Sequence, residues 1–105
     1  MPLHSFAIYE SAAINTYLGD KFRGTGTKEL VPLAGSQERG RYEQLCAATM
    51  AELDGAITIH DRHSAPKADR PAIPEAVASA EKRFASGAEI LAAELAEAGG
   101  EFLLP

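Results

Sequence analysis

The stretch that decides the fold is residues 75–98, EAVASAEKRFASGAEILAAELAEA, which carries the clearest helical period in the chain. Apolar or small residues recur there in steps of three and four, at Val77, Ala80, Phe84, Gly87 or Ala88, Leu91 and Leu95. This spacing predicts one long helix with a single apolar face. Gly99 and Gly100 follow at once, and glycine in this position predicts the end of a helix.

A second long helix is predicted upstream, with Ser36 as its N-cap. Its apolar stripe alternates steps of three and four, through Tyr42, Cys46, Thr49 or Met50, Leu53, Ile57 and His60. If this helix runs to His63, it is roughly 40 Å long at about 1.5 Å rise per residue. Three prolines within residues 64–74 forbid a continuous helix there. The pattern therefore predicts two long helices packed antiparallel across this connection.

The N-terminal end has a different character. Residues 3–9 alternate apolar side chains and predict a short β-strand, with Phe6 and Ile8 on one face. It is the only strand that we expect. A single strand leaves both rows of backbone N–H and C=O groups without partners. We therefore expect it to pair with a segment outside this chain or with a second copy.

A helix is predicted directly after this strand. Ser11 is a favourable N-cap residue, and Glu10 places negative charge near the positive end of the helix dipole. Ile14, Leu18 and Phe22 recur every four residues and form one apolar face. The glycines at positions 24 and 26 predict the end of the helix.

Composition excludes several classes of function. The formal net charge is −5, and the basic residues are scattered rather than gathered into a stripe, which argues against nucleic acid as a partner. The single cysteine excludes an intrachain disulfide and is typical of a reducing compartment. The sequence shows neither a leader pattern nor an apolar run of membrane-spanning length. A cytoplasmic protein without membrane contact is expected.

Residues 9–18, YESAAINTYL, resemble the last strand and following helix of the N-terminal domain of glutathione transferases. Leu30-Val31-Pro32 and residues 38–42, ERGRY, resemble the family's interdomain linker and the start of its first all-α-domain helix. Residues 100–104, GEFLL, resemble the segment before the family's buried helix-capping stretch. The three matches follow one another in the family's order and cover nearly the whole chain.

This resemblance implies a mainly α fold with three parts. Residues 1–24 would be part of a thioredoxin-like, glutathione-binding domain, with one short strand and a helix. Residues 25–35 would be the interdomain linker. Residues 36–105 would be part of the all-α C-terminal domain, with its two long antiparallel helices.

The resemblance also implies an activity, the conjugation of glutathione to a small electrophile, with glutathione as cosubstrate and no metal. Glu10 and Ser11 match the family pair that binds the γ-glutamyl end of glutathione. The family's catalytic Tyr, Ser or Cys, its first strands and its cis-proline belong to a segment upstream of Met1. No catalytic residue is therefore assigned, and we expect an incomplete relative, either truncated or given a wrong gene start, that is inactive alone. The alternative is a non-enzymatic helical interaction or oligomerisation module, and in either case a homo-oligomer is expected.

Other chemistry-bearing residues have simpler interpretations. Cys46 lies in an apolar stripe with no basic partner nearby, so a buried structural thiol is favoured over a redox thiol. His60 and His63 could join Asp61 at a metal, but structural zinc takes four ligands, and histidines also suit the negative end of a helix. The family resemblance instead implies that His60 or His63 contacts the electrophile.

Four further side chains complete the candidates. Tyr9 and Tyr17 do not match the family's catalytic position, and packing is the favoured interpretation for both. Arg39, with Arg41 beside it near the start of the second long helix, is either solvated or at a subunit interface.

Overall fold

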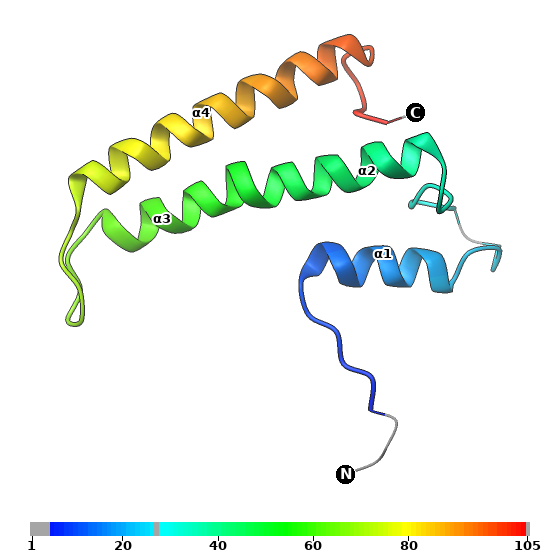
Figure 1. The fold of residues 1–105 in the computed structure, drawn as a ribbon, viewed down its shortest axis with the longest axis horizontal. Helices are drawn as coiled ribbons and strands as arrows, with labels where there is room; N and C mark the ends of the chain where they lie inside the picture. The colour runs from blue at the N-terminus through cyan, green and yellow to red at the C-terminus, as the bar shows by residue number, and fades with distance from the viewer. Residues whose placement is uncertain (1–4, 27, 105) are drawn as a thin grey trace. The chain divides into compact units, whose positions relative to one another are not determined.

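The computed structural model describes residues 5–26 and 28–104, and it is mainly helical (Figure 1). Its elements are α1 (Ser11–Lys21), α2 (Gln37–Ala48), the π-helix η1 (Thr49–Asp54), α3 (Gly55–His63) and α4 (Pro74–Glu97). The chain divides into two compact units, the first reaching to Tyr42 and the second beginning at Glu43. None of the helices in the described ranges combines the length and the apolar character needed to cross a membrane. The predicted mainly α class is confirmed.

The predicted strand over residues 3–9 is wrong for the part that the structure describes. Residues 5–10 have no regular secondary structure and all are exposed, while residues 3 and 4 lie outside the described ranges. The described residues form no sheet, and their one β-bridge joins Lys67 to Arg70 in a turn. A strand is held by a hydrogen-bonded neighbour, and alternation of side chains alone does not supply one.

The first helix is confirmed as α1, but its cap differs from the prediction. The N-cap is Glu10 and Ser11 is the first helical residue, because the chain turns at Glu10 with φ 72° and ψ 114°. The apolar stripe expected for this helix is not buried. Leu18 is 43% exposed, Phe22, which follows the helix, is 53% exposed, and α1 contains no buried residue. Among the described residues of this unit, Val31 is the only buried apolar residue, at 6% exposure.

The second long helix is confirmed in extent and in its N-cap. The Ser36 hydroxyl accepts a hydrogen bond from the Arg39 N–H at 3.1 Å, as a capping serine does. The helix is not α throughout, because residues Thr49–Asp54 form a π-helix between α2 and α3. No single-residue signal in the sequence predicted that segment.

The buried face of this helix lies one residue earlier than the predicted stripe. Leu45 is 8% and Ala56 1% exposed, whereas Cys46 is half-buried and Ile57 is 46% exposed. The expectation of a buried Cys46 is therefore only partly met. The physical reason is close helix packing. Small side chains let two helix axes approach closely, so Ala56 rather than Ile57 faces α4.

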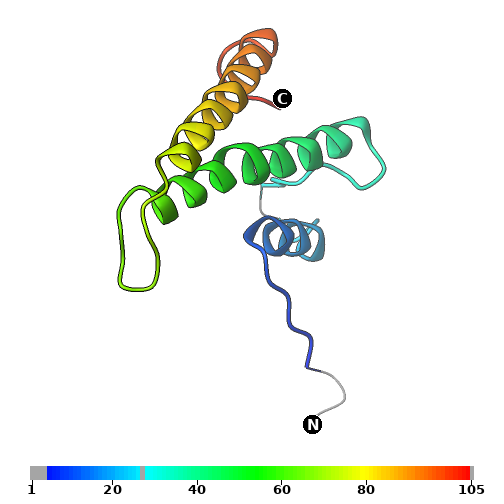
Figure 2. The same ribbon diagram turned by 60° about the vertical axis from the view of Figure 1, so that its left-hand side comes forward.

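Helix α4 confirms the antiparallel pair. Figures 1 and 2 show it running back alongside α3 after the connection at residues 64–73. Gly87 is buried at the contact, and a Cβ placed on it would lie 2.9 Å from the Glu52 Cβ. Ala80, also on α4, is 3% exposed. The core of the second unit is therefore thin and built from small residues, as its alanine-rich sequence indicates.

Both ends of α4 follow from local sequence. Pro74 occupies the first helical turn, where its missing N–H costs nothing. At the other end Gly100 N–H donates to Leu95 O at 2.7 Å and Gly99 N–H to Ala96 O at 3.2 Å. Gly99 has φ 110°, so these bonds form a Schellman cap. The predicted stop at Gly99-Gly100 is confirmed.

Candidate functional site

Glu10 and Ser11 lie together at the N-terminus of α1, and both are exposed. Glu10 is the single non-glycine residue with positive φ among the described residues. Its carbonyl accepts the first helical hydrogen bond, from the Ile14 N–H at 2.9 Å. A residue held in such a sparsely populated backbone conformation destabilises the fold by about 1–3 kcal/mol. Such residues are concentrated at functional sites.

The first turn of α1 has free hydrogen-bond donors. The Glu10 side chain makes no capping hydrogen bond, and the first turn contains no acidic residue. The N–H groups of Ser11, Ala12 and Ala13 precede the first intrahelical bond, so the helix itself does not satisfy them. Together with the helix dipole, these donors favour an anion such as a carboxylate. The Glu10 carboxylate next to them favours a cation, so the corner offers both charges of an amino-acid head group.

His60 lines an open cavity of about 310 Å³ between α3 and α4 in the second unit. The other lining residues come from both helices and are mostly apolar, namely Ala56, Ile57, Ala80, Glu81 and Phe84. The His60 Nε2 lies 3.6 Å from Glu81 Oε1, and its Nδ1 lies 3.4 Å from Asp61 Oδ1. The structure thus places His60 at a pocket, between two carboxylates.

His63 does not line this cavity. Its Nδ1 is buried without a hydrogen-bond partner, and its backbone carbonyl accepts the Ile73 N–H at 3.0 Å where the chain returns toward α4. Within residues 5–26 and 28–104, no group of three or more His, Cys, Asp or Glu side chains is placed to hold a metal ion. Of the two predicted histidines, only His60 therefore has a setting suited to a ligand.

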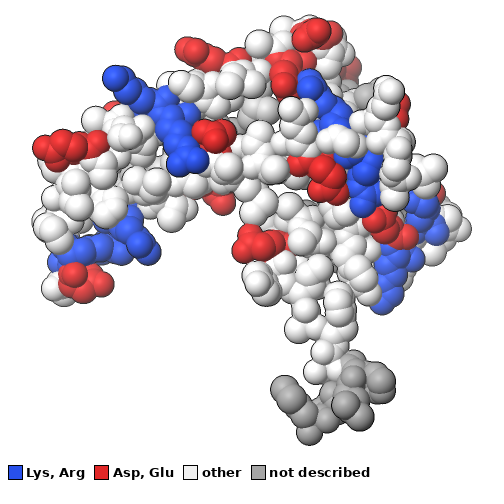
Figure 3. Space-filling model, in the orientation of Figure 1, with Lys and Arg blue, Asp and Glu red and all other residues white. Residues whose placement is uncertain are grey.

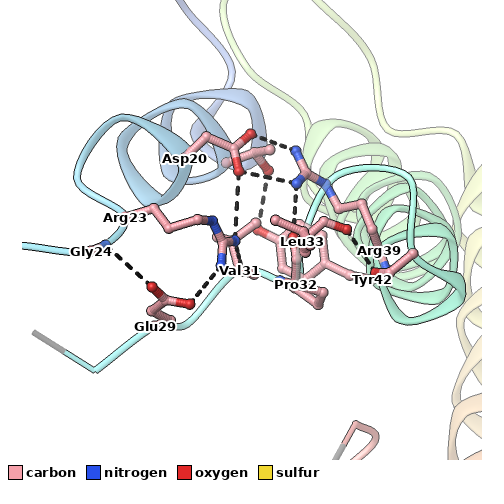
Figure 4. A network of polar contacts seen from close by, with 11 residues as sticks. Asp20, Arg23, Gly24, Glu29, Val31, Pro32, Leu33, Arg39 and Tyr42 are labelled. Carbon is pink, nitrogen blue, oxygen red and sulfur yellow. Dashed lines mark hydrogen bonds and ion pairs between the residues drawn. The ribbon is translucent and has the colours of Figure 1, made fainter.

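Arg39 has a different role from either of those predicted. Its guanidinium binds both carboxylate oxygens of Asp20, at 3.1 and 2.7 Å, and donates to the Pro32 carbonyl at 2.9 Å (Figure 4). The Arg39 side chain is 13% exposed. Its hydrogen bond is the main cause that holds the pKa of Asp20 below its ordinary value of 3.8, assisted by the charges of Arg39 and Arg23. The pair joins the last turn of α1 to the first turn of α2.

Arg23 extends this network along the loop after α1. It donates to Glu29 at 2.6 Å and also to the Val31 carbonyl, and Glu29 in turn accepts the Gly24 N–H at 3.2 Å (Figure 4). Tyr42 and Thr16 add a hydroxyl–hydroxyl hydrogen bond of 3.1 Å. These contacts fix the structure of the first unit around Val31. These contacts could not be predicted from the sequence, since an arginine and an aspartate 19 residues apart have no characteristic spacing.

The two tyrosines differ. Tyr17 packs as predicted. Its ring centroid lies 5.2 Å from that of Phe6, and the Lys21 ammonium lies 5.5 Å from the Tyr17 centroid. Tyr9 is 82% exposed, so the packing interpretation is wrong for it within the described part of the chain.

Acidic and basic side chains are interspersed over the face drawn in Figure 3, which carries no basic stripe.

Comparison with protein-family models, with curated proteins and with solved structures finds no match to this chain.

Proposed function

We propose that the chain is a glutathione transferase-like protein in which Glu10 and Ser11 bind the γ-glutamyl end of glutathione. The observation that carries the proposal is the N-terminus of α1, where an exposed serine and uncapped N–H groups follow a glutamate with φ 72°. The resemblance of residues 9–18 to the family supports the same assignment. Within this proposal residues 1–24 belong to a thioredoxin-like domain, residues 25–35 are the interdomain linker, and residues 36–105, with α2 to α4, belong to the all-α domain.

Recognition of the γ-glutamyl group follows from two complementary charges. The α-carboxylate of the ligand accepts hydrogen bonds from the Ser11 hydroxyl and from the N–H groups of the first turn, at the positive end of the dipole. The α-ammonium of the ligand pairs with the Glu10 carboxylate. A ligand with only one of these charges satisfies only one of the two groups.

The parent reaction in this proposal is attack of the glutathione thiolate on an electrophilic carbon. His60, which lines the cavity between α3 and α4, is the candidate for contact with the electrophile. We assign no catalytic residue among residues 5–26 and 28–104, so the 105-residue chain alone is expected to give no conjugation. Turnover of an aryl halide well above background, lost in Ser11→Ala, would refute this expectation.

Binding is tested by titrating the full chain with glutathione and following amide chemical shifts. Two contacts that immobilise a flexible peptide predict a dissociation constant of the order of 1 mM or weaker. Shift changes at the start of α1 that are lost in Ser11→Ala and in Glu10→Gln, but kept in Ser86→Ala, support the proposal. Cysteinylglycine, which lacks the γ-glutamyl group, serves as the control ligand. Equal shifts with cysteinylglycine would contradict the proposed recognition.

A second candidate, the helical interaction module, is favoured by the apolar side chains that α1 leaves exposed. Leu18 and Phe22 lie on one face of α1, at 43% and 53% exposure. Association of two copies through this face would cover them and predicts a concentration-dependent mass in light scattering. A monodisperse monomer with one cooperative melting transition would eliminate this candidate.

A further inference from the structure

We propose that the cavity between α3 and α4 binds a small aromatic ammonium ion. This is the cavity that the proposed function assigns to the electrophile through His60, but the inference does not rest on glutathione binding, because every residue that carries it belongs to the second unit. The cavity has a volume of about 310 Å³, which is at the lower end of the range for small-ligand sites. A ligand with one aromatic ring and a short chain suits that size.

The apolar part of the cavity arises from the alanines at the helix contact. Ala56 and Ala80 are 1% and 3% exposed, and their methyl groups do not extend far enough to fill the space beside them. Ile57 and Phe84 border the same space and stay 46% and 39% exposed. A ligand ring that covers these two side chains would remove apolar surface from water, which is the main source of affinity at such a site.

The polar edge of the cavity selects the charge of the ligand. Glu81 is 65% exposed, and its Oε1 lies 3.6 Å from the His60 Nε2, beyond hydrogen-bond length. Asp61 lies on the other side of that imidazole, at 3.4 Å. Lys82 and Arg83 follow Glu81 along α4, but neither lines the cavity, and Arg83 is paired with Glu52 at 3.2 Å.

This arrangement favours a cation over an anion. The Glu81 carboxylate lines the cavity, and the chain as a whole carries a formal charge of −5. An ammonium group at Glu81 makes a charge-assisted hydrogen bond and lies near the ring of Phe84, which also attracts cations. A carboxylate ligand at the same edge would meet like charge.

The probe is phenethylammonium chloride, titrated into the full chain at low salt and about pH 8, where carboxylates are ionised. Two probes of similar shape are compared with it, phenethyl alcohol and hydrocinnamate, which are neutral and anionic. Amide shifts of α3 and α4 report binding. We expect saturable shifts with the ammonium, about fivefold weaker binding of the alcohol, and no saturation with hydrocinnamate.

Variants locate the site and its charge. Glu81→Gln should weaken binding of the ammonium by about fivefold and bring it to the level of the alcohol, while Glu89→Gln, on the same helix, should leave it unchanged. Phe84→Leu, which keeps an apolar side chain, should weaken it by about threefold through loss of the aromatic face. Far-ultraviolet circular dichroism establishes that each variant is folded as the parent chain is.

Each other outcome overturns the proposal. Absence of saturable shifts in α3 and α4 eliminates the site. Equal binding of ammonium and alcohol, or equal loss in Glu81→Gln and Glu89→Gln, eliminates selection by charge. Preference for hydrocinnamate would show that the edge recognises anions.

Discussion

Replacing Gly87 with alanine measures how closely α4 packs against the π-helix η1. A Cβ at this position would lie 2.9 Å from the Glu52 Cβ and 3.2 Å from Leu53 Cδ2. The comfortable separation of two carbon atoms is about 3.5–4.0 Å, so the helices must move apart. Overpacking of this kind costs about 1–3 kcal/mol, and the better helix propensity of alanine returns about 0.5–1 kcal/mol. The net expectation is a loss of about 1 kcal/mol of folding free energy.

The matched control is Gly40→Ala in α2, where an added Cβ meets nothing within 4 Å. There only the propensity gain applies, so this variant should stabilise the chain by about 0.5–1 kcal/mol. For a chain of about 100 residues, 1 kcal/mol shifts the melting temperature by about 4–8 °C. Thermal melts followed by circular dichroism should therefore move in opposite directions for the two variants. Amide hydrogen exchange of α4 and of α2 reads each helix separately.

The reasoning is refuted if Gly87→Ala stabilises the chain as much as Gly40→Ala does. That result would mean that α4 does not contact Glu52 and Leu53 as closely as the structure has it. A neutral effect of Gly87→Ala with reduced exchange protection in η1 would instead locate the cost of the shift in the π-helix.

Further predictions concern the first unit. Ser36→Ala removes the oxygen that caps α2 and should cost about 1 kcal/mol in a urea titration; an unchanged midpoint would show that the cap contributes nothing. The pKa of Asp20 is lowered in the folded chain, chiefly by the Arg39 hydrogen bond, so this carboxylate stabilises the fold above its ordinary pKa of 3.8. That stabilisation should disappear as the pH falls through the lower folded value, and Arg39→Met should abolish this part of the acid dependence; identical acid titrations of parent and variant would contradict it. Glu10→Gly relieves the positive φ and should stabilise α1 by about 1 kcal/mol while abolishing the proposed glutathione binding, and a loss of stability measured by exchange in α1 would argue against backbone strain.

The helices were predictable because their signals are local. The start of α2 depends on Ser36 and on an N–H three residues later, and the end of α4 depends on bonds within the six residues from Leu95 to Gly100. Interactions between residues so close in sequence depend little on the tertiary contacts of the helix. The same is true of Pro74 at the first turn of α4.

The candidate sites were predictable only in part. Glu10 and Ser11 are neighbours in sequence, so their meeting at the start of α1 was expected, whereas the positive φ of Glu10 was not. The pocket around His60 needed Glu81 and Phe84 from the other helix, and no spacing indicates which residues of two helices will face each other. The strand prediction failed for a related reason, because a strand depends on a partner that alternation does not reveal.

The sequence by itself determined the helical class, the outer ends of the two long helices and the break that the prolines within residues 64–74 predicted, since caps, prolines and glycines act over a few residues. Only the tertiary structure decided that Leu45 and Ala56, rather than Cys46 and Ile57, face the interior. It likewise decided that Arg39 binds Asp20. The physical reason is that helical period fixes a face only to within one residue, while the close approach permitted by Gly87 selects which residues are buried.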